Sequence, residues 1–179
     1  MAERKKIDEK LDDAEYIKKI TDDYLETKET ISLAFFKDGP PENYVRERYT
    51  SRGGRFYNKK GGLMKKDQQL YVKQIPAHLK SRLTKLVVNK TAEYYIDIDI
   101  NFYVAIQKNE SIKKSVLKEK QIILPAIRPD IDNYLKFTID SLHNVLFDDD
   151  KRIVFVNSHK FYSLKPRTEI LAKITIIKD

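Results

Sequence analysis

The chain has 179 residues, 41% of them hydrophobic and 35% charged, which fits one folded domain with an unusually ionic surface. It has no apolar run near the roughly 20 residues that cross a bilayer, no N-terminal secretory signal and no cysteine. Disulfides, thiolate nucleophiles and Cys-bound zinc are therefore excluded. We expect a cytoplasmic protein without membrane contact, in which oxygen or His ligands hold any metal, a donor set that favours magnesium.

The net charge of +8 is concentrated in one stretch of the chain. Residues 44–90 hold 13 basic residues against Glu47 and Asp67, whereas residues 1–29 hold 7 basic and 10 acidic residues. Lys and Arg side chains that neutralise phosphates release condensed counterions, so the basic stretch predicts affinity for nucleic acid. A solvated basic face that serves solubility is the alternative interpretation.

The first half of the sequence predicts one strand, with helices before and after it along the chain. Residues 1–29 carry apolar residues at spacings of three and four, which predicts one charged amphipathic helix whose apolar stripe packs on some other surface. Residues 30–36 predict a strand, which the following Gly-Pro-Pro ends. Residues 42–62 are typical of a flexible basic arm or hairpin, and two basic helices separated by a proline follow at 64–74 and 77–89.

The second half predicts most of the sheet. Apolar and polar residues alternate over 93–106, which indicates a strand with one buried face. The Lys-rich residues 107–121 predict an exposed excursion. Helical spacing then runs from Asp130 to near Phe147, and two further strands are expected at about 152–162 and 168–177.

This order of elements predicts an α+β fold, a mixed α/β layer in which helices pack against one small sheet. We expect two parts: an acidic helical extension over 1–29 and the main domain over 30–179.

The most informative segment is RPDIDNYLKFTIDSLHNVLFDDDKR at 128–152. Asp130 and Asp132 flank a helix start, where free N–H groups and the helix dipole favour negative charge. Lys136 and Asp140 follow at intervals of four, so charges alternate along one helix face. The helix leads to the acids 148–150, and clustered carboxylates in a basic protein suggest a divalent cation.

Each of these acids also has an ordinary structural interpretation. Asp130 alone is often only an N-cap, Asp132 a favourable first-turn acid, and three consecutive acids are usually a solvated turn. Asp97 and Asp99 fit the wet face of a strand and are not assigned to the site. The histidines are scattered, and surface or satisfied-core roles are favoured for each of them: His78, His143 and His159.

The stretches PDIDNYLKFTIDSL and FDDDKRIV resemble the signature of the RusA family of Holliday junction resolvases, found in bacterial and phage genomes. In that family a Pro-Asp-x-Asp-Asn helix start precedes a lysine, and an Asp-Asp pair precedes a strand. The segment GPPENYVRERYTSRGGRFYNKKG at 39–61 is similar to the family's proline-proline turn and basic arm. The resemblance covers about residues 30–177; the helix at 1–29 and the length of 107–121 go beyond the family pattern.

The resemblance implies roles for individual residues. The essential aspartates fall on Asp130, Asp132 and Asp150, with Asp149 as a neighbouring metal ligand, and Lys136 takes the place of the catalytic-site lysine. It also implies Mg²⁺, for which Mn²⁺ can substitute, and a homodimer that cuts four-way junctions or other branched DNA. The expected DNA-binding residues are Asn43, Arg52, Arg55, Lys59, Lys60 and Asn133.

The expected function is thus paired phosphodiester hydrolysis at Holliday junctions or related branched DNA. Two other functions stay open: a module that binds branched or single-stranded DNA without cutting it, and a phage structural or regulatory protein. The sequence leaves open the cut-site preference, the number of metal ions, the dimer surface and the roles of residues 1–29 and 107–121.

Overall fold

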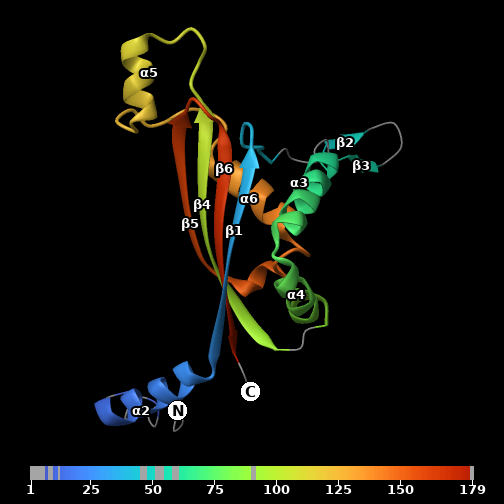
Figure 1. Cartoon of the computed structure of the whole chain (residues 1–179), viewed down its shortest axis with the longest axis vertical. Helices are drawn as coiled ribbons and strands as arrows, with labels where there is room; N and C mark the ends of the chain where they lie inside the picture. Colours follow the sequence, from blue (N-terminus) through green and yellow to red (C-terminus); the bar gives the residue numbers. More distant parts are fainter. Residues whose placement is uncertain are drawn as a thin grey trace.

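A four-stranded mixed sheet forms the centre of the computed structural model, which describes residues 7, 10–11, 13–44, 48–50, 55–57, 61–89 and 92–177 (Figure 1). The strand order is β1-β6-β4-β5. Strand β6 pairs antiparallel with β1 and β4, and β4 pairs parallel with the edge strand β5. The strands are β1 (Lys28–Asp38), β4 (Glu93–Ala105), β5 (Ile153–Ser163) and β6 (Arg167–Ile177).

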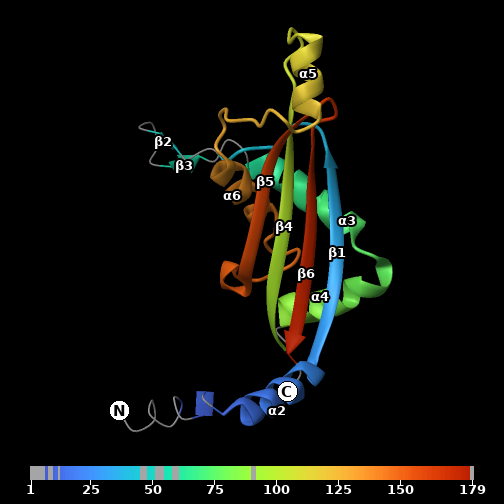
Figure 2. The ribbon, with the colours of Figure 1, turned by 90° about the vertical axis from the view of Figure 1, so that its left-hand side faces the viewer.

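Three helices lie on the same side of this sheet (Figures 1 and 2). They are α3 (Gly61–Gln74), α4 (Ala77–Asn89) and α6 (Ile131–Leu142). The sequence prediction of an α+β fold is therefore confirmed, as is the division of α3 from α4 beside Pro76. No helix in the described part of the chain is long and apolar enough to span a membrane.

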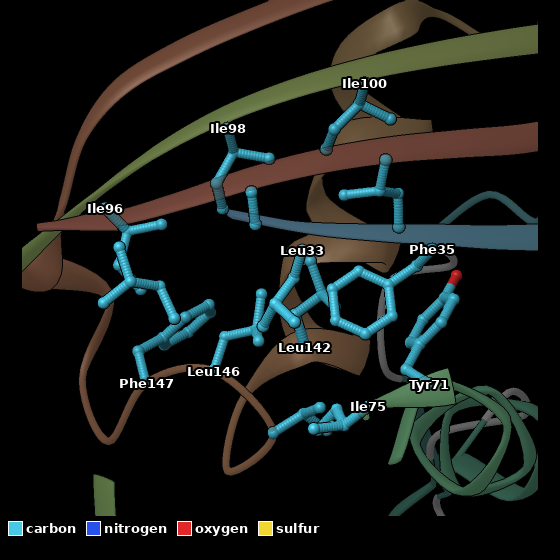
Figure 3. Packing of buried hydrophobic residues seen from close by; sticks show 14 of the residues in the cluster. Leu33, Phe35, Tyr71, Ile75, Ile96, Ile98, Ile100, Leu142, Leu146 and Phe147 are labelled. Carbon is cyan, nitrogen blue, oxygen red and sulfur yellow. The ribbon is translucent and has the colours of Figure 1, made fainter. Parts of the chain in front are cut away.

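The core lies between the sheet and these helices (Figure 3). Strand β4 has the predicted alternation, with Ile96, Ile98 and Ile100 fully buried and Asp97 and Asp99 on the opposite face. Burying one large apolar side chain contributes about 1.5–3 kcal/mol, so the buried face of β4 is a main source of the stability of the core. Other core residues that Figure 3 labels are Leu33, Phe35, Tyr71, Ile75, Leu142, Leu146 and Phe147.

Helix α2 (Ala14–Glu26) differs from the prediction at its C-terminal end. It ends before residue 29, because the Thr27 hydroxyl bonds the Tyr24 carbonyl oxygen and Lys28 already pairs with Ile177 of β6. The described part of this chain offers no surface against which its apolar stripe packs, so the expected packing stays a prediction. None of its residues is buried, and the helix extends beyond the end of the sheet (Figure 1).

The segments around α6 also correct the prediction. The exposed excursion holds a short helix, α5 (Ile112–Glu119), whose N-cap is Ser111. Helix α6 ends at Leu142 and not near Phe147, because Asn144 has a φ of 61° and the chain turns there. Val145, Leu146 and Phe147 still point into the core from this turn. A single turn of 3-10 helix, Asp150–Arg152, leads into β5.

The basic arm contains a small hairpin of β2 (Arg48–Thr50) and β3 (Arg55–Tyr57), as the hairpin interpretation predicted. It follows the turn after β1, in which Gly39 has a φ of 92° and donates a hydrogen bond to the Pro166 carbonyl oxygen. Figures 1 and 2 show the hairpin away from the sheet.

Candidate active site

Asp130 stands at the N-cap of α6 without capping it. Its backbone is extended, and its carbonyl oxygen accepts bonds from the N–H groups of Asn133 and Tyr134 at 3.2 and 3.4 Å. Its carboxylate, however, accepts no capping hydrogen bond, and the residue is exposed. Helix capping therefore does not explain the Asp130 side chain.

Lys136 and Asp132 lie on the exposed side of α6, and the loop after β1 is attached to the same helix. The backbone N–H of Tyr44 donates to the Asn133 carbonyl oxygen at 2.7 Å. The Lys136 ammonium lies 4.2 Å from the centre of the Tyr44 ring, within the range of a cation–π contact. The predicted catalytic Lys136 thus contacts Tyr44, near the start of the basic arm.

A hollow of about 520 Å³ lies at the C-terminal end of α6. Carboxylates of α6 and of the turn before β5 gather around it together with an aromatic residue of the arm's loop. Its lining residues are Tyr44, Met64, Asp140, His143, Asp148, Asp149 and Asp150. The structure therefore brings the predicted acids Asp149 and Asp150 together with Tyr44.

The three consecutive acids differ in their partners. The Asp148 carboxylate accepts a hydrogen bond from the Tyr94 hydroxyl at 3.0 Å and from Arg152 Nε at 3.3 Å, so it fixes the turn to the sheet. Asp149 accepts from the Lys151 N–H at 3.0 Å, and this bond and the Lys151 charge lower the Asp149 pKa. Asp150 is exposed, begins the 3-10 turn and faces the hollow.

Asp140 is a site residue that the sequence prediction did not assign. Burial raises the pKa of its half-buried carboxyl; the Lys136 charge opposes the rise and Asp150 adds to it. Asp140 and Asp150 therefore repel each other across the hollow. The signal in the sequence was the four-residue interval that joins Asp132, Lys136 and Asp140 on one helix face.

Asp130 lines a different hollow, of about 410 Å³, with Arg128, Ile131 and Lys160. The 12 residues of α6 give a helix about 18 Å long, with Asp130 at its first end and the larger acidic hollow at its second. Within the described residues, no three His, Asp or Glu side chains form a cluster that fits a metal ion. The ligand set Asp130, Asp132, Asp149 and Asp150 accordingly stays a prediction.

The structure describes only some of the predicted DNA-binding residues. Asn43 lies in the loop after β1 and donates through Nδ2 to the Tyr44 carbonyl oxygen at 3.2 Å. Asn133 contacts Asp132 at 3.4 Å and holds Tyr44 through its carbonyl oxygen. Arg55 belongs to β3 by its backbone, and its side chain lies outside the described part of the chain, as do the residues Arg52, Lys59 and Lys60.

Comparison with known protein families gives one match that covers most of the chain. The profile of the family described as Endodeoxyribonuclease RusA matches residues 38–173. The chain belongs to the RusA endodeoxyribonuclease family. The RusA match contains the loop with Tyr44, the basic arm, α6 and the acidic turn, and it leaves out α2. The matched region therefore includes the candidate site together with β4 and β5, whereas α2 lies outside it.

A curated relative resembles part of the chain. The uncharacterized protein YqaN of Bacillus subtilis (strain 168) is 34% identical over 80 residues, which cover 44% of this chain and 56% of YqaN. The chain thus matches about half the length of this relative.

Proposed function

We propose that the protein is a metal-dependent endodeoxyribonuclease that resolves Holliday junctions or related branched DNA in the cytoplasm by paired hydrolysis. The observation that carries this proposal is the RusA match over residues 38–173, which includes both acidic segments and the basic arm. Membership of this family supports a Holliday junction resolvase in general. The Asp130 carboxylate makes no capping hydrogen bond, and an acidic hollow lies at the other end of α6. Both observations support cutting over binding alone.

The donor chemistry of the predicted ligands suits a hard divalent cation, although Asp130 and the acids 149–150 lie towards opposite ends of α6 in this structure. All the predicted ligands, Asp130, Asp132, Asp149 and Asp150, offer carboxylate oxygens, the donors that Mg²⁺ and Mn²⁺ prefer. Asp150 raises the pKa of Asp140, and a cation beside these groups would offset their repulsion. When bound, Mg²⁺ lowers the pKa of a coordinated water and stabilises charge on the scissile phosphate.

Lys136 brings positive charge next to the acidic hollow. Its ammonium lies over the Tyr44 ring. Burial raises the pKa of Asp140 and the Lys136 charge opposes that rise, so this charge acts on a carboxylate of the hollow. We assign it to the scissile phosphate, with which a lysine ammonium forms a charge-assisted hydrogen bond. Tyr44 belongs to the basic arm, residues 42–62, and its N–H is bonded to α6. Phosphates that the arm contacts would therefore lie near the same helix.

Junction resolution requires two symmetric cuts, and the chain carries one acidic constellation. We therefore propose a two-fold homodimer, in which each subunit cuts one strand. Mixing wild-type subunits with Asp132→Asn subunits should give heterodimers that nick one strand and fail at paired incision. A monomer at micromolar concentration that still makes paired cuts would contradict the dimer.

Cleavage of a synthetic four-way junction, with and without Mg²⁺, tests the function. We expect cleavage only with Mg²⁺ or Mn²⁺, and none by Asp132→Asn, which should still bind the junction because one negative charge near the phosphate is removed. Activity of this variant within about threefold of wild type, or about 0.65 kcal/mol in barrier, would contradict a ligand role. Binding without cleavage by the wild type would favour a binding module, and neither activity a structural or regulatory protein.

The basic arm has a separate test. Replacing Arg52, Arg55, Lys59 and Lys60 together with glutamine should weaken binding to every DNA shape. It should also reduce the slope of log K against log salt by up to about 0.9 for each phosphate that the arm no longer neutralises. An unchanged slope would move the DNA-binding surface to another part of the protein.

A further inference from the structure

Residues 121–130, which lead into the candidate site, form neither helix nor strand. Apolar burial holds the middle of this segment, where Pro125 is buried and Ile123 packs against the core. Towards Asp130 the burial is weaker, since Ile127 is 41% exposed. Asp130 ends the segment, and its carboxylate lacks the capping bond that would fix it to α6. The place of Asp130 therefore depends on what holds the backbone just before it.

Lys160 of β5 binds the backbone just before Asp130. Its ammonium donates to the Ile127 carbonyl oxygen at 2.7 Å and to the Pro129 carbonyl oxygen at 3.1 Å. Hydrogen bonds from a charged donor are about twice as strong as neutral ones, and β5 pairs with β4 without a register shift from Phe155 to Ser163, which includes Lys160. One side chain thus ties two carbonyls of an irregular segment to the sheet.

The same lysine shares a hollow with the aspartate. Asp130, Arg128 and Lys160 line the hollow of about 410 Å³ at the start of α6. Lys160 pairs in register with Phe102 of β4, whose ring stacks on Tyr134 of α6 at 5.3 Å. The strand position that carries Lys160 is therefore fixed relative to α6 by core packing.

We propose that Lys160 is a positioning residue for Asp130: it binds the carbonyls of Ile127 and Pro129 and so sets where the carboxylate stands at the start of α6. This inference rests on the proposed function for the importance of Asp130, but the contact itself does not. Two of the three N–H donors of the ammonium serve the backbone, so Lys160 acts on the site through Asp130 and not as a ligand of DNA.

The test uses Lys160→Met in the full chain, with Lys173→Met as the matched control, because Lys173 is an exposed lysine on β6 of the same sheet. Hydrogen exchange of a peptide that covers residues 122–133 should become faster in Lys160→Met and stay unchanged in the control. Junction cleavage should fall about 10- to 100-fold in kcat, the order of effect that a displaced catalytic group produces, with KM within about twofold of wild type. Lys160→Arg, which keeps N–H donors, should restore part of the kcat.

Three results would overturn the proposal: wild-type exchange over 122–133 in Lys160→Met, a raised KM with unchanged kcat, or no better activity in Lys160→Arg than in Lys160→Met. The raised KM would make Lys160 a direct DNA contact. If circular dichroism shows that Lys160→Met is unfolded, Lys160→Gln decides by the same exchange and kinetic measurements. If the wild type does not cut junctions, the proposed function fails, whereas hydrogen exchange still decides the role of Lys160.

Discussion

Replacing Lys37 with methionine removes the cation that faces the carboxylate of Asp67. The Lys37 ammonium lies 2.6 Å from Asp67 Oδ2, and the two side chains are only 15% and 9% exposed. Removing one partner of a buried pair costs about 3–5 kcal/mol because the other charge stays buried. Since both side chains keep some solvent contact, we expect about 3 kcal/mol, and a Tm lower by about 6–12 °C in a chain of this size.

The pH dependence identifies the cause of this destabilisation. Burial raises the pKa of Asp67, and the hydrogen bond and charge of Lys37 oppose that rise. Without Lys37 the pKa in the folded protein rises further above 3.8, so the cost is full at neutral pH. It disappears as the pH falls through the folded pKa and the carboxyl takes up a proton.

Thermal and urea unfolding of Lys37→Met at pH 7 and pH 4 measures this prediction. The double variant Lys37→Met with Asp67→Asn is the control, and it should recover most of the stability because no buried charge remains. A destabilisation below about 0.5 kcal/mol, the usual range of surface substitutions, would refute the argument. An equal destabilisation at both pH values would do the same, and would point to the contact of Lys37 with the Phe137 ring.

Three further changes test the site and its support. Asp140→Asn should raise the Tm at pH 7, because burial raises the pKa of Asp140 and the charged form destabilises the fold, and the gain should fade towards pH 4; no gain at pH 7 would count against this. Leu142→Ala, at a fully buried position, should lower the free energy of unfolding by about 3–4 kcal/mol in urea unfolding. A loss below about 1 kcal/mol would mean that the surrounding core closes over the missing atoms without leaving a cavity. Tyr94→Phe should cost about 1–2 kcal/mol, since burial and Asp148 raise the Tyr94 pKa to about 12 and keep its hydroxyl a donor; unchanged stability would show that the Tyr94 hydroxyl does not hold Asp148.

Sequence periodicity predicted the elements whose burial follows a simple period. Strand β4 alternates strictly, and α4 has the predicted bounds at 77–89 because its flanking proline marks the start. Periodicity failed at the end of α6, where Val145, Leu146 and Phe147 are buried from a turn. Apolar spacing reports which residues face the core, and a turn that follows a helix can bury them equally well.

The sequence predicted a site from its acids, but not the contacts that each acid makes in the fold. Asp148 is bound to Tyr94, which lies 54 residues away, and no local pattern predicts such a contact. The strand pattern gave Lys160 no role, although its ammonium holds the backbone before Asp130. The apolar stripe of α2 predicted a packing partner, and the described part of this chain provides none. Partners distant in sequence depend on the tertiary fold, which pattern reasoning does not reach.

The parallel pairing of β4 with β5 sets the order in which a new chain acquires its parts. Parallel neighbours need a long crossover connection, and here the crossover between Ala105 and Ile153 carries α5, α6 and all the predicted aspartates of the site. Closing so long a loop costs conformational entropy, which is offset only when β4 and β5 have paired. Such non-local contacts form slowly. During synthesis the basic stretch 44–90 is therefore made well before β5, whose pairing with β4 closes the crossover that carries the acidic segments.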